Sequence, residues 1–287
     1  MKIIEVDIWS SFGCFSKHFS NTGGVLTHLI PPKTSIIGII GAILGYDVND
    51  YEDNDDGTKT YKIESLNNIK VSIYPLFEFK TKRVIFNLVS GTNLDLDIKN
   101  INQDVLISPR YKLFISFPSE LDEVEELFLN RVKNNKTIYN LYMGRNEFPL
   151  NLEFVREINA EKHIFSNDNS DELKSIKVYG SLNRSSIKSL NLSYEDNDSK
   201  VDSDALSLIS SLLISNSADG VRHLKSFHEF TIKDYPIKRE NFTDFSYSPV
   251  SFYSSKKFGE CFFSNLQLKD GEIELVNIGD DKWLSLI

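Results

Sequence analysis

The chain has 287 residues, 40% of them hydrophobic and 25% charged, the composition of a soluble globular protein long enough for one large domain or two small ones. Its 41 acidic residues outnumber 32 basic ones, and the net charge of −9 excludes a protein that coats nucleic acid with its whole surface. Cys14 and Cys261 are too few for a disulfide framework and lack zinc-site spacing, so we expect a reducing compartment.

The first predicted element is a half-buried strand near the N-terminus. Ile4, Val6 and Ile8 alternate with other residues, and this period of two is typical of a strand with one face in the core. Glu5 and Asp7 interrupt the apolar stretch, which does not suit a secretory signal. We therefore expect a cytoplasmic protein.

The second predicted element is a helix that begins after two prolines. Pro31 and Pro32 stop the preceding segment, and Thr34 or Ser35 can cap the helix. The first-turn N–H groups have no partner within a helix, and together with the helix dipole they favour an anion. Lys33 and Thr34 are therefore candidate phosphate contacts.

The body of this helix combines a glycine side with an aliphatic stripe. Gly38, Gly41 and Gly45 fall with Ala42 on nearly one side, which predicts close approach of another backbone. The buried stripe is predicted to contain Ile36, Ile39, Ile40, Ile43 and Leu44. The apolar run is far shorter than the roughly 20 residues that span a bilayer.

The pattern from residue 47 to residue 155 predicts the last strand of a first β-α-β unit, a hairpin excursion, and then a second β-α-β unit. A polar insertion at 47–60 leads to strands at 69–76, 83–90, 105–107 and 110–117. Ser119 resembles a helix cap, and the apolar spacing after it predicts a helix with the stripe Leu121, Val124, Leu127, Phe128 and Val132. A glycine turn at Gly144 and a closing strand follow. The resulting order is that of the α+β, ferredoxin-like (RRM-like) split βαβ fold over residues 1–155.

Residues 156–287 predict a smaller, β-rich C-terminal region. Short strands such as 176–179 accompany a helix at 205–214, and Asp270-Gly271 between two strand-like runs predicts a hairpin. The polar stretches 166–171 and 195–204 are typical of surface loops with weak order. No long internal repeat is present.

Three segments resemble the CRISPR-associated protein 5 family, a branch of the RAMP superfamily, with the type I-B lineage as the nearest. They are the run from Asp7 to Lys17, the Pro31-Pro32-Lys33-Thr34 helix start through Gly45, and Tyr142-Met143-Gly144-Arg145-Asn146-Glu147-Phe148. The second segment is the specific one. Lys33 stands where the family often has Arg, and a lysine cannot bind phosphate bidentately.

The resemblance implies a non-catalytic subunit of a type I interference (Cascade) complex in antiviral defence. Such a subunit holds the 5′ handle of the CRISPR RNA at one end of the complex and contacts the backbone and large subunits. The excursion at about residues 80–110 would be the thumb of the family. Neither a cofactor nor a metal is implied, and no membrane.

The candidate RNA contacts are Thr34 and the basic residues of the three segments, of the excursion and of the strand after it. The predicted set is Lys17, Lys33, Thr34, Lys80, Lys82, Arg83, Arg110 and Arg145, with Lys112 as a further member of a basic groove. Trp9, Phe12 and Phe15 could stack on bases, although Trp9 fits the core better. The glycines of an ordinary RNA-recognition motif are absent around Arg110.

Two alternatives stay open at the sequence level. One is a metal-independent endoribonuclease that processes precursor CRISPR RNA, for which Tyr46, Lys17 with His18, or Lys162 with His163 could act as acid and base. The other is a ferredoxin-like protein-interaction module without a nucleic-acid ligand. No pair of histidines has the spacing of a metal site.

Overall fold

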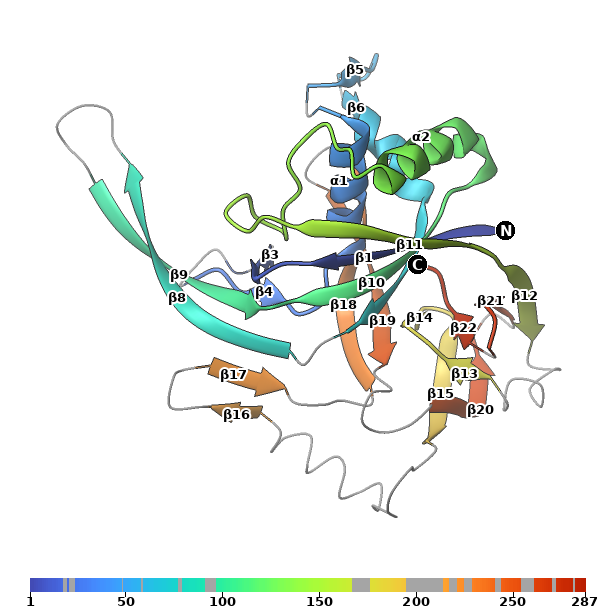
Figure 1. Cartoon of the computed structure of the whole chain (residues 1–287). Helices are drawn as coiled ribbons and strands as arrows, with labels where there is room; N and C mark the ends of the chain where they lie inside the picture. The colour runs from blue at the N-terminus through green and yellow to red at the C-terminus, as the bar shows by residue number, and fades with distance from the viewer. Residues whose placement is uncertain are drawn as a thin grey trace.

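Most of the chain is folded into strands. The computed structural model describes residues 1–17, 20, 24–47, 49–57, 59–76, 79–90, 97–166, 176–194, 214–216, 221–224, 229–240, 244–253, 261–269, 272–280 and 282–287. Within these ranges the fold is mixed, with many strands and two α-helices (Figure 1). No helix among the described residues is long and apolar enough to cross a membrane.

A four-stranded antiparallel sheet forms the first part of the molecule. Its order is β11 (Asn151–Asn159), β1 (Lys2–Trp9), β10 (Arg110–Ser116) and β7 (Lys70–Pro75). The helices α1 (Lys33–Leu44) and α2 (Asp122–Lys133) pack against the face that carries Ile4, Val6 and Ile8. Along the chain β1, α1 and β7 are followed by two further strands and then by β10, α2 and β11.

The hairpin of β8 (Phe79–Ser90) and β9 (Asp97–Ile107) projects from this sheet as a long arm (Figure 1). β17 (Val221–Leu224) pairs with the base of β8 and carries β16 (Ile214–Asn216), while β2 (Phe12–Gly13) pairs with β9. Along the arm, Ile85 is 65% exposed and Phe86 37% exposed. The arm therefore presents apolar side chains to solvent.

Two further sheets are built from the later part of the chain. One has the order β12 (Glu161–Ser166), β21 (Glu272–Asn277), β22 (Lys282–Leu284), β13 (Lys177–Val178), β20 (Cys261–Leu268) and β15 (Ile187–Tyr194). The other is β14 (Ser181–Asn183), β19 (Asp244–Tyr253) and β18 (Glu229–Glu240). Tyr235, Val250 and Phe252 of the second sheet join the core cluster of α1 and β1. The division at residues 155 and 156 stays a prediction.

Short elements complete the described structure. They are β3 (Phe15–Ser16), β4 (Thr27–His28), β5 (Tyr51–Asp53), β6 (Lys59–Tyr61) and the 3-10 segments η1 (Lys62–Asn68) and η2 (Ser119–Leu121). β3 pairs with β4, and β5 pairs with β6.

Two predictions about the later part have different outcomes. The strands beside Asp270-Gly271 exist, but β22 and β13 lie between β20 and β21, so the predicted hairpin is wrong. The long-range pairing of β21 with β12 and β22 outweighs the local turn signal. Of the predicted helix at 205–214, residues 205–213 lie outside the described residues, and Ile214 begins β16. Of the predicted loop at 166–171, Ser166 ends β12 and residues 167–171 lie outside the described residues, as does the predicted loop at 195–204.

The helix starts differ from the prediction. Pro32 occupies the N-cap of α1 and neither Thr34 nor Ser35 caps it, because the helix begins at Lys33. Ser119 likewise opens η2 rather than capping α2, whose N-cap is Leu121.

Two predicted packing positions also change. In α2, Leu127 is 43% exposed and Leu129 is buried in its place. In α1, a Cβ on Gly38 would meet nothing within 4 Å, so Gly38 does not support a close approach. Gly45 ends α1 with φ +77°, and a Cβ there would meet the side chain of Ile138 rather than the predicted neighbouring backbone.

Candidate nucleic-acid interface

The predicted RNA contacts are spread over several surfaces rather than one groove. Lys33 and Thr34 lie on α1, and Lys80, Lys82 and Arg83 lie on β8. Arg110 lies on β10, while Lys17 and Arg145 follow β3 and the turn at Gly144. Of the candidate aromatic residues, Phe15 is buried, Trp9 is half-buried and Phe12 is 50% exposed.

Lys33 is buried at the start of α1. Its Nζ donates a hydrogen bond to the Asn67 carbonyl at 3.2 Å. Burial, assisted by Lys70 and Lys238, lowers the pKa of Lys33 from 10.5 to about 8. Beside it, the Tyr235 hydroxyl donates to the Pro31 carbonyl at 2.8 Å. The side chain of Lys33 therefore lies inside the protein, and only Thr34 of the predicted pair is partly exposed.

A hollow of about 340 Å³, the first hollow, lies along α1. Thr34 and Ser35 line it from the first turn of the helix, and Tyr142 from the loop after α2. Arg239 of β18 and Phe245 of β19 line it from the opposite side, with the guanidinium 5.3 Å from the ring centre. No aspartate or glutamate is among the described residues that line it.

The three segments that carry the family resemblance meet around this first hollow. Phe15 and Ser16 come from the first segment, the α1 residues from the second, and Tyr142 and Gly144 from the third. The chain neighbours Lys17 and Arg145 place two predicted contacts next to lining residues. Segments separated by more than a hundred residues in sequence thus form one site.

A glycine joins the first and third segments. Gly144 has φ +86°, and a Cβ there would lie 2.2 Å from the Cys14 carbonyl oxygen. The Cys14 N–H donates to the Met143 carbonyl at 3.0 Å. Only glycine combines this left-handed backbone with such a close approach, so the Gly144 turn holds Tyr142 and Arg145 against residues 14–16.

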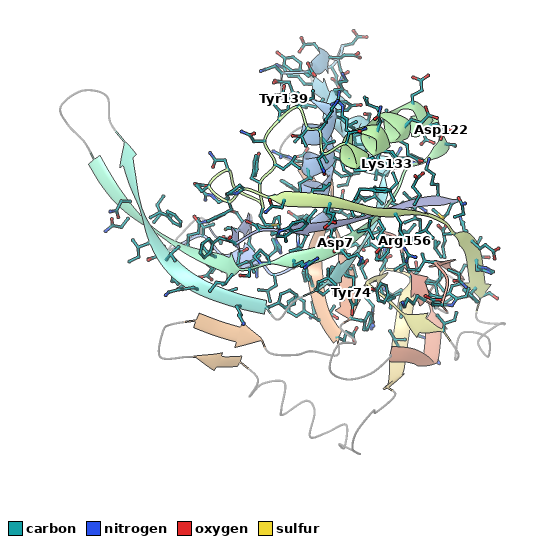
Figure 2. The ribbon with its side chains drawn as sticks, in the orientation of Figure 1. Asp7, Tyr74, Asp122, Lys133, Tyr139 and Arg156 are labelled. Atoms are coloured by element: carbon teal, nitrogen blue, oxygen red, sulfur yellow. The ribbon has the colours of Figure 1, made fainter. Side chains whose placement is uncertain are left out.

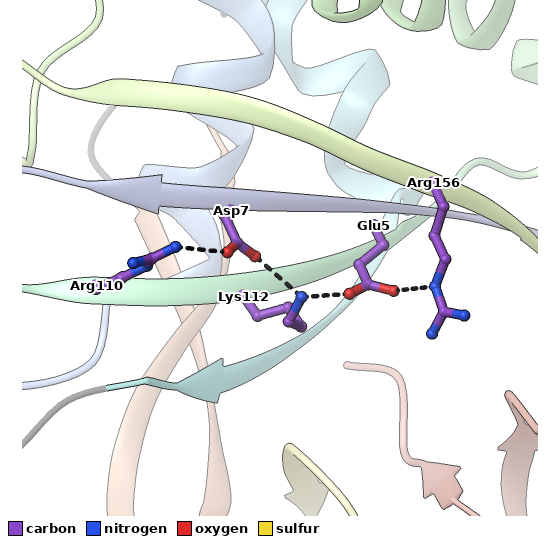
Figure 3. A network of polar contacts seen from close by, with 5 residues as sticks. All are labelled: Glu5, Asp7, Arg110, Lys112 and Arg156. Carbon is purple, nitrogen blue, oxygen red and sulfur yellow. Dashed lines mark hydrogen bonds and ion pairs between the residues drawn. The ribbon is translucent and has the colours of Figure 1, made fainter. Parts of the chain in front are cut away.

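Charged side chains on the opposite face of the sheet form a network (Figure 3). The Arg110 Nη2 lies 3.2 Å from Asp7 Oδ2, and Lys112 Nζ lies 3.1 Å from Asp7 Oδ1. Lys112 also pairs with Glu5, whose Oε2 accepts from Arg156 Nε at 2.7 Å. Burial would raise the pKa of Glu5, but the hydrogen bonds from Lys112 and Arg156 outweigh it and lower the pKa.

The network limits what Arg110 can offer to a ligand. Its guanidinium is paired with Asp7 and lies 5.6 Å from the Trp9 ring centre. Arg83 on the arm is paired in the same way, through Nε to Asp104 Oδ1 at 2.8 Å. Lys82 is exposed beside it. Figure 2 shows Asp7 and Arg156 on the sheet, well separated from Tyr139 beside α1.

Several residues of the first hollow were missed at the sequence level. Arg239 and Phe245 follow Thr34 by about 200 residues and belong to no recognisable motif. Their strands, β18 and β19, pack beside α1 through Tyr235 and Phe252. Alternating apolar residues could have indicated these strands, but no local signal indicates which strand lies beside which helix.

Of the residues considered for a nuclease, the pair Lys162 and His163 lies on β12 of the C-terminal sheet. Lys162 Nζ lies 2.6 Å from Glu274 Oε2, and His163 packs against Phe165 and Trp283 on the C-terminal sheet. His18 lies outside the described residues. Where side chains are described, no three His, Cys, Asp or Glu residues are placed to hold a metal ion.

Comparison with known proteins gives the family. Residues 3–211 match the family described as CRISPR-associated protein (Cas_Cas5). The chain therefore belongs to the Cas5 family of CRISPR-associated proteins. No curated protein matches it at a significant level.

Solved structures similar to the chain share little sequence with it. A CRISPR protein from Archaeoglobus fulgidus has 11% identity and a TM-score of 0.40, over 100% of this chain and 98% of that one. A chain of a CRISPR RNA-guided surveillance complex has 9% identity and a TM-score of 0.42, over 90% and 91%. A further Cas protein has 13% identity and a TM-score of 0.31, over 50% of this chain and 57% of that one.

Proposed function

We propose that this protein is a non-catalytic, RNA-binding subunit of a type I CRISPR interference complex, of the I-B lineage, acting in the cytoplasm. It holds the 5′ handle of the CRISPR RNA and caps one end of the complex, in contact with the backbone and large subunits. Membership of the Cas5 family supports this role. The observation that carries it is the meeting of three family segments around one hollow that has no carboxylate among its described lining residues.

The chemistry of the first hollow suits single-stranded RNA. Arg239 supplies a cation next to the Thr34 hydroxyl, and Tyr142 and Phe245 supply rings on which bases can stack. Lys17 and Arg145 follow lining residues in the chain, and the guanidinium of Arg145 is paired with Glu147 at 3.4 Å. Because Lys33 is buried, we assign the RNA contact at this helix to Thr34 and Arg239 instead.

The fold supports two finer proposals. A ferredoxin-like domain is the first, and the sheet order β11-β1-β10-β7 with both helices on one face supports it. The β8–β9 arm, with exposed Lys82, Ile85 and Phe86, is proposed as the thumb that presses on the guide.

RNA binding by the full-length chain tests the proposal. A fluorescently labelled handle RNA and a scrambled RNA of equal composition are titrated with protein at several salt concentrations. We expect handle-specific binding that Arg239→Gln weakens by about tenfold. Arg184→Gln, which removes an arginine that pairs with Glu229 and does not line the hollow, is the matched control.

The other two functions predict different results. Equal affinity for both RNAs at moderate salt would favour a protein-interaction module and contradict the proposal. Site-specific cleavage of repeat RNA in EDTA, seen on a denaturing gel, would identify an endoribonuclease and contradict the non-catalytic role.

A further inference from the structure

A second hollow of about 370 Å³ lies on the other flank of α1. It shares Thr34, Gly38, Ala42, Asn140, Tyr142 and Arg239 with the first hollow, and its remaining lining residues are different. Three tyrosines, Tyr46, Tyr61 and Tyr139, line the second hollow and not the first, and Tyr142 lies between the two. Tyr139 and Tyr142 are 41% and 45% exposed, so the rings are accessible to a partner.

The second hollow also carries carboxylates, which the first hollow lacks. Asp47 and Glu64 line it opposite Arg239. The Tyr139 hydroxyl donates to Asp47 Oδ2 at 3.0 Å, which fixes one ring beside one carboxylate. Glu64 is half-buried and forms no hydrogen bond or ion pair with any residue that the structure describes, although its charge acts on Arg239. A half-buried carboxylate favours a cation beside it.

The surroundings of the second hollow are acidic as well. The segment 47–57, which includes β5, has no lysine or arginine and contains Asp47, Asp50, Glu52, Asp53, Asp55 and Asp56. A neighbouring hollow shares Tyr61 and Glu64 and adds Asp50, Glu52 and Glu240 against Lys62 and Lys238. This surface repels a phosphate backbone and attracts a basic partner.

We propose that the second hollow receives an arginine or lysine side chain from a basic, extended segment of a neighbouring protein subunit. The tyrosine rings contact the cation through their faces, and Glu64 supplies the opposite charge. Two lysines of the chain already form cation–π contacts with tyrosines in this region. Lys62 Nζ lies 4.7 Å from the ring centre of Tyr46, and Lys59 Nζ lies 3.6 Å from that of Tyr51.

The inference goes beyond RNA binding and assigns the two flanks of α1 to different partners. The first hollow, without a described carboxylate, takes RNA, while the second, with two, takes a protein cation. The acid-rich segment 47–57 acquires a role as the region that attracts the basic partner.

A peptide titration tests the docking site. The probe is a fluorescein-labelled peptide of glycine and serine with two arginines, and its twin carries neutral citrulline in place of arginine. We expect the full-length protein to bind the arginine peptide with a Kd of about 1 mM or tighter, and the citrulline twin at least about tenfold more weakly. Glu64→Gln is expected to weaken arginine-peptide binding by about tenfold.

Matched controls make the test decisive. Glu153→Gln removes the same charge from an exposed position on β11 and should leave peptide binding unchanged. Thermal melts show whether both variants fold. Equal binding of the two peptides, equal effects of the two substitutions, or no binding at 1 mM would each overturn the inference.

RNA binding by the same variants separates this inference from the proposed function. We expect Glu64→Gln and Glu153→Gln to have the same affinity for handle RNA. A loss of RNA affinity in Glu64→Gln alone would assign the second hollow to RNA and overturn the inference, while handle binding by the unsubstituted chain would still support the proposed function.

Discussion

Lys33 provides a sharp test of the packing at the start of α1. Its Nζ is buried against the Asn67 carbonyl, and its pKa is lowered from 10.5 to about 8. An unfolded chain with the ordinary pKa therefore binds a proton at Lys33 more tightly than the folded one. The charged lysine destabilises the fold below pH 8, and this penalty is relieved as the pH rises from 8 toward 10.5.

The size of the effect follows from the shift. A difference of about 2.5 pKa units corresponds to a penalty of about 3 kcal/mol at neutral pH, of which about 2.5 kcal/mol is relieved between pH 7 and pH 10. Lys33→Met removes the titrating group. From pH 7 to pH 10, the free energy of unfolding of the unsubstituted protein should therefore rise by about 2.5 kcal/mol relative to that of Lys33→Met.

Urea unfolding at pH 7, 8, 9 and 10 measures this difference. Lys82→Met removes the same charge from an exposed position on the arm and controls for net charge. Parallel pH profiles for the unsubstituted protein and Lys33→Met would refute the burial of a charged lysine. A Lys33→Met variant that folds normally yet loses handle RNA would instead make Lys33 an RNA contact.

Three further substitutions test other parts of the structure. Glu5→Gln should cost about 2 kcal/mol of unfolding free energy at neutral pH, because it removes the carboxylate that pairs with Arg156 and one of the two that pair with Lys112. Since the pKa of Glu5 is lowered from 4.5, that difference should shrink as the pH falls below 4.5; a pH-independent difference in urea unfolding would contradict the network. Gly144→Ala should lower the melting temperature far more than Gly57→Ala, because both have positive φ but only Gly144 approaches another backbone; equal shifts would contradict that contact. Gly38→Ala should stabilise the fold by up to about 1 kcal/mol, because its Cβ meets open space in the helix; destabilisation in urea would instead restore Gly38 as a packing residue.

Local patterns predicted the elements that depend on local physics. The alternation of Ile4, Val6 and Ile8 and the aliphatic stripe of α1 both correspond to buried faces in the structure. The order of elements along the first 155 residues could be predicted, because each element has a local pattern. The order of strands within the sheets could not be read from these patterns, because it depends on long-range pairing. The Asp270-Gly271 prediction was wrong because strand partners distant in sequence decided the pairing.

The candidate site was only partly predictable. Thr34 was found because a helix start after prolines has unpaired N–H groups, whatever surrounds it. Whether Lys33 lies inside or outside depends on η1, which supplies the Asn67 carbonyl, and on Tyr235 of β18. Arg239 was missed because its place in the lining of the first hollow comes from the packing of β18 beside α1, which no spacing in the sequence reports.

Photocrosslinking tests the central claim most directly. The full-length protein is bound to handle RNA that carries 4-thiouridine, irradiated, digested and examined by mass spectrometry. If the first hollow holds the handle, crosslinked peptides will contain Tyr142 or Phe245, whose rings line it. Crosslinks confined to the acid-rich segment 47–57 or to the C-terminal sheet, with none at the first hollow, would contradict it.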